Sequence, residues 1–452
     1  MSITRYITAT LFACAVSLSA LAQLPQNTSG LYASQADSLD VAGQLSVRVN
    51  PDLDIPVAES AFGRTDISAY PWIDLSANRI ELNGADWSPL QQAFDRAAIR
   101  RVGIVHIGDS HIQADGATEV TRKLLQASYG NGGRGFIAPL KLASTNEPLN
   151  YKLTSTSKFT SARLLKRPWA VEMQFSGVAV SPVSERFDLT VDTETLRSLP
   201  DPFNVVRLFT DGAPVAVDSI KVSDGDIGFG CSVSDGLTEI RLDRSVPSIT
   251  LYLRSEAKTI IAGLELLNGN RGVVYNAIGN NGAGFGSYSG LRLGEKIAMM
   301  NPSLVVLSMG TNEAFGTALP ERVVETIDHM VGEIRSGCPE AQILLVTPQE
   351  CHSKVLLKRR NGRKRRARFV VNPRVRLMRD LIVDYGRTHG IAVYDYYAVA
   401  GGQNSTDRWV EAGLFGRDHI HLSWAGYAVM GQLLGDAIAG AIKPHDHLPD
   451  GE

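Results

Sequence analysis

Cysteine is scarce in this sequence, and neither sign of charge is in excess. The 452 residues include four cysteines and carry a formal net charge of -2. So few cysteines exclude a disulfide scaffold. The balanced charge gives no support to a nucleic-acid partner, for which a basic excess is expected. The cysteines show no metal-ligand spacing either. His419 and His421, or His445-Asp446-His447, could hold a metal, but no further ligand cluster accompanies them, so we expect neither a catalytic metal nor another cofactor.

Apolar runs long enough to cross a membrane are also missing after the first 22 residues. Residues 7–21 are apolar, Arg5 precedes them, and Ala20-Leu21-Ala22 is a small-x-small cleavage site. This pattern predicts a secretory signal peptide at residues 1–22, because about 15 apolar residues are short for a bilayer span. We therefore expect export to the periplasm or the medium. Lipid attachment at Cys14 is the alternative, since Leu11-Phe12-Ala13-Cys14 faintly resembles a lipoprotein cleavage box.

Three cysteines remain after that cleavage, namely Cys231, Cys338 and Cys351. The odd number leaves at least one thiol free. An extended strand between Cys338 and Cys351 would hold them roughly 20 Å apart, so we expect no bridge between them.

Strands alternate with helices in two stretches, residues 76–150 and 269–443. Five apolar strands among helices of amphipathic spacing predict a parallel sheet covered on both faces. The expected strands are Arg101–Ile107, Val273–Ala277, Leu304–Met309, Gln342–Thr347 and Ile391–Tyr394. The expected helices are Trp87–Ala98, Asp115–Tyr129, Tyr288–Met300, Glu321–Arg335, Val375–Thr388 and Ala425–Ile442.

Residues 151–268 have a different pattern, in which short alternating runs are separated by turn residues. This pattern predicts an inserted all-β sandwich, with Trp169 and Tyr252 expected in its core and a sugar-binding platform as the alternative role for them. The expected strands are Val171–Phe175, Phe187–Val191, Val205–Phe209, Ile220–Val222, Thr238–Leu242 and Ile249–Leu253. Residues 23–75 are polar and mixed, which predicts a flexible leader, and residues 444–452 form a tail.

Four short segments follow predicted strands or precede the last helix. They are Gly108-Asp109-Ser110, Asn276 to Ala283, Gly310-Thr311-Asn312-Glu313 and Asp418 to Ser423. Ligand sites in open α/β sheets lie at the carboxyl ends of the strands, so these segments should converge. An aspartate three residues before a histidine can orient the imidazole as a base for a serine. Glycine N–H groups and an asparagine amide are suitable donors to an oxyanion.

In this order, the four segments resemble the sequence blocks of the SGNH (GDSL-like) hydrolases. The resemblance implies a three-layer α/β/α fold with a flavodoxin-like parallel sheet. It makes Ser110 the nucleophile, and Asp418 and His421 the other members of the triad. Ser110, Gly282 and Asn312 match the oxyanion donors, although Gly279 lies near enough to Gly282 to be an alternative.

Further details are similar to peptidoglycan O-acetylesterases of bacterial envelopes. They are His111 directly after the serine, a β-rich insertion, and Gly401-Gly402 with Trp409 before the last block. Peptidoglycan O-acetylesterases have an insertion resembling a carbohydrate-binding module. The resemblance implies removal of acetyl groups from an acetylated polysaccharide such as peptidoglycan, with His111 and Trp409 as possible substrate contacts.

Plainer interpretations remain for several residues. His106 alternates with buried strand residues and is expected to be a hydrogen-bonded core histidine. The basic run Lys358–Arg368 follows the fourth predicted strand and is either a solvated loop or a contact for an anionic glycan. The chain could also be a polysaccharide O-acetyltransferase of the same fold, or a glycan-binding envelope protein without turnover. The intact catalytic set argues against the last of these.

Overall fold

The computed structural model describes residues 64–195, 199–356 and 367–442. The predicted signal peptide, Cys14 and the tail at 444–452 lie outside the described residues, as does the basic run up to Arg366. Among the residues that are described, no helix is both long and apolar enough to cross a bilayer.

A mixed seven-stranded sheet carries the four sequence segments. Its order is β1-β20-β17-β16-β2-β15-β3, and its strands pair in parallel except at β1, which is antiparallel to β20. All five predicted parallel strands are present, and β1 and β3 extend the sheet at its edges. The strands are β1 (Ile80–Glu81), β2 (Arg101–Gly108), β3 (Asn131–Gly133), β15 (Gly272–Gly279), β16 (Pro302–Ser308), β17 (Gln342–Val346) and β20 (Ala392–Tyr394).

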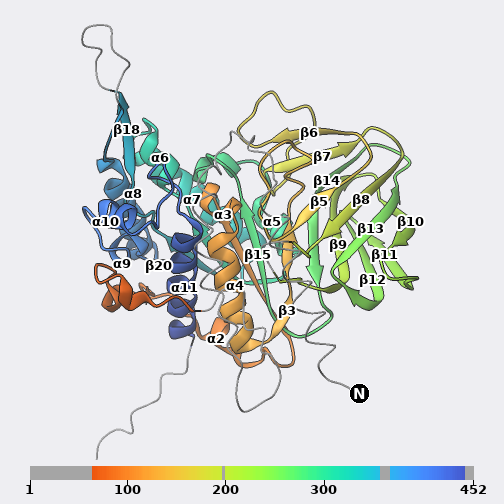
Figure 1. Ribbon diagram of the computed structural model, residues 1–452, viewed down its shortest axis with the longest axis horizontal. Coiled ribbons are helices and arrows are strands. Elements are labelled where there is room, and N and C mark those ends of the chain that lie inside the picture. Colours follow the sequence, from red (N-terminus) through yellow and green to blue (C-terminus); the bar gives the residue numbers. More distant parts are fainter. Residues whose placement is uncertain (1–63, 196–198, 357–366, 443–452) are drawn as a thin grey trace, which may run out of the picture. The chain divides into compact units, whose positions relative to one another are not determined.

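Helices cover both faces of this sheet, as expected for strands that are buried on two sides (Figure 1). On one face α4 and α11 pack side by side, whereas α5, α7 and α8 pack on the other. The longer helices are α2 (Ser88–Asp95), α4 (Gly116–Tyr129), α7 (Pro320–Gly337), α8 (Pro373–His389) and α11 (Trp424–Ala441). The shorter ones are α3 (Ser110–Gln113), α5 (Leu293–Ala298), α6 (Thr311–Phe315), α9 (Tyr396–Val399) and α10 (Thr406–Glu411).

One predicted helix, Tyr288–Met300, is wrong in its first half. A 3-10 turn, η5 (Phe285–Tyr288), is followed by Gly290 at φ +79° and Arg292 at φ +53°, and helix α5 begins only at Leu293. Positive φ values are incompatible with a continuing right-handed helix.

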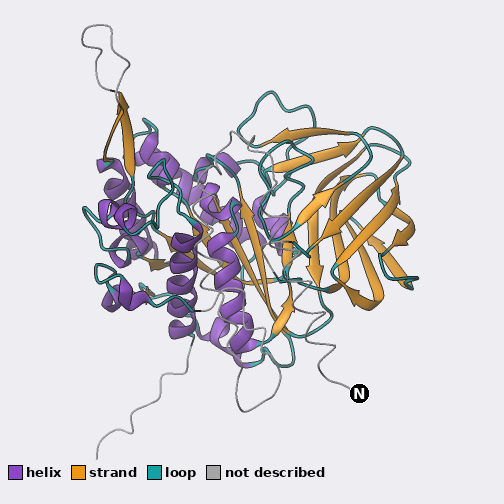
Figure 2. Ribbon diagram, in the orientation of Figure 1, coloured by secondary structure: helices purple, strands orange, loops and turns teal. Residues whose placement is uncertain are grey.

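Two antiparallel sheets are formed by the chain between β3 and β15, and they lie to one side of the helices (Figure 2). One has the order β10-β13-β8-β5 and the other β11-β12-β9-β14-β7-β6, with β4 paired to β14. Their strands are β4 (Gly135–Ile137), β5 (Lys152–Thr154), β6 (Phe159–Arg163), β7 (Val178–Pro182), β8 (Arg186–Asp192), β9 (Phe203–Gly212), β10 (Ala216–Lys221), β11 (Phe229–Ser234), β12 (Leu237–Val246), β13 (Ser248–Arg254) and β14 (Thr259–Leu267). The predicted class, an α/β/α hydrolase fold with an inserted β domain, is therefore correct.

The predicted strand Val171–Phe175 is absent, although its apolar side chains are buried. These residues lie in an irregular segment that belongs to none of the sheets. Apolar and polar residues alternate along them as they would in a strand, so the sequence pattern could not reveal that their backbone lacks a partner.

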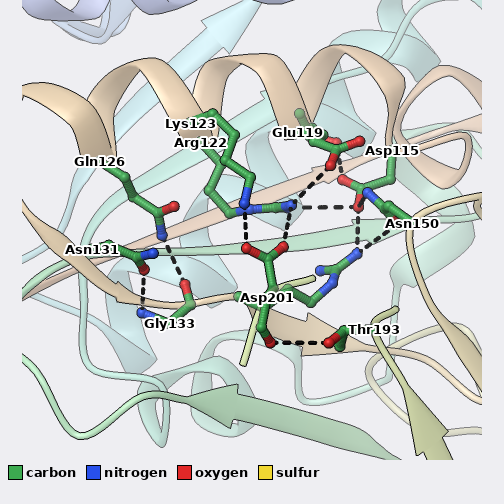
Figure 3. Close-up of polar contacts among 12 residues, drawn as sticks. Asp115, Glu119, Arg122, Lys123, Gln126, Asn131, Gly133, Asn150, Thr193 and Asp201 are labelled. Atoms are coloured by element: carbon green, nitrogen blue, oxygen red, sulfur yellow. Dashed lines mark hydrogen bonds and ion pairs between the residues drawn. The ribbon is translucent and has the colours of Figure 1, made fainter. Parts of the chain in front are cut away.

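The antiparallel region and the α/β fold share a buried network of charged side chains (Figure 3). Arg122 on α4 is fully buried and lies 3.4 Å from Asp201 and 3.7 Å from both Asp115 and Glu119. Asp201 immediately precedes β9 and also pairs with Lys123. Because buried charges are tolerated only when they are paired, this network fixes Asp201 against α4.

Residues 64–75, the described part of the predicted leader, are hydrogen-bonded to the α/β fold. Arg64 forms an ion pair with Asp436, and the Thr65 backbone bonds to the Gln432 side chain, both on α11. The predicted domain boundaries remain a prediction.

Candidate active site

The nucleophile candidate lies at the turn between β2 and α3. β2 is buried after Arg101, and Ser110 is the first residue of α3. Asp109 caps this short helix by accepting a hydrogen bond from the His111 N–H at 2.9 Å. The turn therefore places the Ser110 hydroxyl at the carboxyl edge of the sheet, as the sequence predicts.

Ser110, His421 and Asp418 form a continuous hydrogen-bonded chain. The His421 Nε2 lies 2.8 Å from the Ser110 Oγ, and its Nδ1 lies 2.6 Å from the Asp418 Oδ2. The other Asp418 oxygen accepts the backbone N–H groups of Ile420 and His421 at 3.0 and 2.9 Å. These two bonds fix the carboxylate, which in turn orients the imidazole toward the serine.

Charges in this chain are arranged so that the imidazole can accept a proton. Burial alone would lower the pKa of His421, but the hydrogen bond and the charge of Asp418 outweigh it and raise that pKa above its usual value. Burial would likewise raise the pKa of Asp418, yet the contacts with His421 lower it to about 2. Asp418 is therefore ionised at neutral pH and stabilises the imidazolium.

The loop after β15 distinguishes Gly282 from Gly279. Gly279 pairs with Gly108 at the end of the strands, and any Cβ there would overlap the backbone of Gln113 on α3. Gly279 is thus required for close packing of strand and helix. Gly282 instead lies in the loop at φ +81°, a backbone conformation that favours glycine.

The backbone N–H groups around Gly282 are almost all engaged. The Asn280 N–H donates to the Gly108 carbonyl, and the Ala283 N–H donates to the Asn280 carbonyl. The Asn281 N–H donates to the Gln113 side chain, and the Gly284 N–H donates to the Ser287 hydroxyl. Within the described part of the chain, the N–H groups of Gly282 and Ser110 donate to no protein acceptor. Two backbone donors are therefore free for a ligand beside the Ser110 hydroxyl.

Asn312, the third predicted donor, lies in the same place but is partly engaged. Its side-chain amide donates to the Ala283 carbonyl at 2.9 Å and lies 3.3 Å from the Asp109 carboxyl. The first bond holds the amide against the Gly282 loop. The second is long and weak, so this N–H is the one available to an oxyanion.

Several supporting residues were not singled out from the sequence. The Gln113 side chain accepts the Asn281 N–H at 2.7 Å, and Glu313 accepts the N–H groups of Phe285 and Gly310 at 2.7 and 3.1 Å. Asp109 is buried between the site segments, which raises its pKa to about 7. Asp109 and Glu313 lie within the segments Gly108-Asp109-Ser110 and Gly310-Thr311-Asn312-Glu313, so their positions indicated a place near the site. Nothing in the sequence indicated the role of Gln113.

Of the two predicted substrate contacts, only His111 lies at the site. Its ring centroid is 5.4 Å from that of His421, and burial, together with the charge of His421, lowers its pKa to about 3. The expectation that Trp409 contacts the substrate is wrong, because its side chain is fully buried. Its indole N–H donates to the Ala400 carbonyl at 2.8 Å, and its ring packs against Tyr396 and Phe415. It cannot contact a substrate in this arrangement.

His106 is a hydrogen-bonded core histidine, as expected. Its two ring nitrogens lie 2.7 and 2.6 Å from the hydroxyls of Tyr275 and Ser308, and it is buried inside the sheet. Cys231, Cys338 and Cys351 are all free thiols. No group of three or more possible metal ligands occurs in the described ranges.

The antiparallel region reaches the site through Leu165. This side chain is 50% exposed, and its Cδ1 would lie 2.9 Å from a Cβ placed on Gly282. Nearby, the Asn280 amide donates to the Ser176 carbonyl at 2.8 Å. The segment between β6 and β7 therefore forms one wall beside the free N–H of Gly282.

A hairpin from the opposite side contacts the loop that holds Asp418 and His421. It consists of β18 (His352–Leu356) and β19 (Ala367–Val371). The Nδ1 atoms of His352 and His419 are 3.0 Å apart, and the Phe369 ring stacks on His419 with centroids 3.9 Å apart. This hairpin therefore supports the catalytic loop directly.

Comparison with known proteins agrees with this geometry. Residues 259–429 match the model of the GDSL-like lipase/acylhydrolase family, a span that contains Gly282, Asn312, Asp418 and His421 but not Ser110. No curated protein matches the chain.

Among solved structures, a peptidoglycan O-acetylesterase is similar, with 21% sequence identity and a TM-score of 0.63. The match covers 80% of this chain and 99% of that one. A putative acylhydrolase from Bacteroides fragilis shares 18% identity over 38% of this chain and 76% of its own, with a TM-score of 0.28. At 21% identity, the likeness to the peptidoglycan O-acetylesterase shows a common fold. Over residues 259–429 the chain is similar to the GDSL-like lipase/acylhydrolase family, and its fold brings Ser110, His421 and Asp418 together.

Proposed function

We propose that the chain is an exported serine esterase that removes O-acetyl groups from a cell-envelope polysaccharide, with peptidoglycan as the substrate. The observation that carries this proposal is the Ser110–His421–Asp418 chain beside two free backbone N–H groups. The acetyl carbon is attacked by the serine, and the same N–H groups bind the carbonyl oxygen as it becomes negative.

In the proposed reaction His421 is first a base and then an acid. Its Nε2 takes the Ser110 proton while the Ser110 oxygen forms a bond to the acetyl carbon. The N–H groups of Ser110 and Gly282 and the Asn312 amide stabilise the oxyanion. When the C–O bond to the sugar breaks, His421 returns its proton to the leaving alcohol. Water then hydrolyses the acetyl-serine by the same steps, and acetate leaves.

A polysaccharide substrate is supported by the surroundings of the site. Leu165 gives the site an exposed apolar wall that comes from the antiparallel region. The fold is shared over most of the chain with a protein described as a peptidoglycan O-acetylesterase. Export is supported by the signal pattern at residues 1–22.

A second surface also suits a glycan. Tyr252 was expected in the core but is 42% exposed, on the sheet that contains β8 and β13. It borders a cavity of about 310 Å³ with Asp188, Thr190 and Lys221 in its wall. An exposed aromatic ring among hydroxyl and charged groups can stack on a sugar and hydrogen-bond its hydroxyls. Trp169 is half-buried beneath the Arg167 guanidinium, 4.1 Å from its ring centroid, so it does not offer such a face.

The decisive experiment measures acetate release from O-acetylated peptidoglycan and hydrolysis of a small aryl acetate by the wild type and by Ser110→Ala. We expect both reactions in the wild type and neither in the variant. Aryl acetate hydrolysis without release from peptidoglycan would retain the esterase but reject this substrate. Transfer of acetate to an added glycan in preference to water would favour the acetyltransferase alternative.

A further inference from the structure

A cavity of about 500 Å³ lies at the end of the central sheet opposite to Ser110. It is bordered by the first residue of β2, by the start of β15 and by strands β9, β12 and β14 of the antiparallel region. The parallel pairing of β2 with β15 places Arg101 beside Gly272 at this end and Gly108 beside Gly279 at the catalytic end. The cavity is thus separate from the active site.

Positively charged side chains outnumber negatively charged ones in the wall of this cavity. Four arginines and two glutamates line it, namely Arg100, Arg101, Arg207, Arg271, Glu239 and Glu265. Both glutamates are paired with Arg207. Glu265 pairs with its Nη1, and Glu239 lies 3.6 Å from its Nε. Glu239 also pairs with Arg241 at 2.6 Å. Both acidic groups are therefore engaged by other arginines, although the charge of Glu265 also acts on Arg101 and partly compensates for it.

Three guanidinium groups are left without a carboxylate partner in the part of the chain that the structure describes. Arg101 is partly buried and donates one bond, from its Nε to the Asn270 carbonyl at 3.1 Å. Arg100 and Arg271 are exposed and form no ion pair. Burial lowers the pKa of Arg101, against the opposing charge of Glu265, and the charges of Arg241, Arg271 and Arg207 lower it further. The neighbouring arginines therefore disfavour the charged form of Arg101, and Glu265 compensates only in part.

The rest of the wall is mostly apolar and includes Ile99, Met299 and Met300, with Asn301 as its one polar residue. Ile99 is 73% exposed and offers an apolar surface at the edge of the cavity. Guanidinium groups bind carboxylate and phosphate oxygens in pairs, and methionine adapts to varied apolar shapes. The wall therefore combines an anion-binding side with an adaptable apolar side.

We propose that this cavity is a second binding site, which takes a small organic oxyanion. Its carboxylate or phosphate binds Arg100, Arg101 and Arg271, and its apolar part covers Ile99 and the two methionines. The ligand bridges β2 and β15 of the hydrolase sheet to β9, β12 and β14 of the antiparallel region. It joins the two regions and relieves the repulsion among the arginines.

Calorimetry and thermal unfolding of the mature chain test this site with phenyl phosphate, inorganic phosphate and benzoate, at constant ionic strength set with chloride. Phenyl phosphate or benzoate should bind and raise the Tm. Binding of phenyl phosphate but not of benzoate would identify the natural ligand as a phosphate. Binding of benzoate but not of phenyl phosphate would identify it as a carboxylate. Inorganic phosphate should bind more weakly than phenyl phosphate, because it cannot contact the apolar wall.

The double variant Arg100→Ser/Arg271→Ser should weaken binding by about 100-fold or more, since each of the two lost bonds to a charged group contributes about tenfold in affinity. Without ligand, the same variant should unfold at a higher temperature than the wild type, because like charges have been removed. Arg387→Ser is the matched control: this arginine is exposed on α8 and pairs with Asp384. Absence of binding by all probes at millimolar concentration, or equal affinities in variant and control, would overturn the proposal.

Discussion

At the scale of single residues, the site depends on which N–H and carboxyl groups have partners. The hydroxyl, imidazole and carboxylate are joined by bonds of 2.8 and 2.6 Å, and the N–H groups of Ser110 and Gly282 have no acceptor in the described part of the chain. Each side chain therefore has one task, and substitutions should separate these tasks.

Ser110→Ala and His421→Ala should each lower kcat for aryl acetate by about 10⁶-fold, because nucleophile and base act as one unit. Neither change should affect the fold, since both side chains lie at the sheet edge. Steady-state kinetics and circular dichroism check this. Full activity in either variant would rule out the triad.

Asp418→Ala should be milder, with a loss of about 10⁴-fold, because the carboxylate orients and stabilises without taking the proton. The base works only when neutral, so activity rises with pH through the pKa of His421. Asp418 raises that pKa above its ordinary value of about 6.5. In the variant, burial, which lowers the pKa of His421 and is the largest influence on it, is opposed only by the charge of Asp109, so the acid limb of the kcat/KM profile should move to lower pH. An unmoved limb would contradict the electrostatic role.

Gly282→Ala and Gly279→Ala should fail in different ways. At Gly282 the positive φ and the nearness of Leu165 force the loop to move, which displaces the N–H donor; loss of one such donor costs about 100-fold in kcat or more. At Gly279 the new methyl group overlaps the backbone of α3, so stability should be lost instead. Kinetics and thermal unfolding of both variants distinguish these results. A stable, inactive Gly279→Ala would assign the donor to Gly279.

At the scale of elements, the antiparallel region is tied to α4 through buried charges. Asp201→Ala should destabilise the protein by about 3 to 5 kcal/mol, because it leaves Arg122 and Lys123 without this carboxylate. Denaturant unfolding measures the loss. Asp218→Ala is the control, since Asp218 pairs with Arg186 and Arg254 at the surface, and its removal should have a much smaller effect. Equal losses would show that burial of the network is unimportant.

At the scale of the whole molecule, deletion of residues 151–268 should abolish hydrolysis of both small and polymeric esters. The sequence favours a separable unit, but β4 pairs with β14, Asp201 binds α4, and Leu165 borders Gly282. Removing these contacts exposes the core of the hydrolase fold and opens the site. Expression of the deletion variant with a short linker, followed by aryl acetate assays, tests this. Retained small-ester hydrolysis would restore the separable-unit view.

The sequence predicts those features that local pattern determines. Apolar runs located the five parallel strands, and because strand ends share one edge, Ser110, Gly282, Asn312 and the Asp418 loop were expected together. Burial and partners depend on the tertiary structure, so Trp409 looked available but is enclosed, and Tyr252 looked enclosed but is exposed. Val171–Phe175 alternates like a strand yet has no neighbouring strand. Nor did any motif mark the arginines around the second cavity.

Strands β2 and β15 run from the arginine cavity to the catalytic edge. Eight residues of extended chain span about 25 Å, so no molecule the size of one sugar reaches both ends. An inhibitor that acylates Ser110 and a small anion at the other end would therefore occupy the protein together without competing. A long polymer, by contrast, has the reach to engage both ends at once, and its two attachments would then reinforce each other through effective concentration.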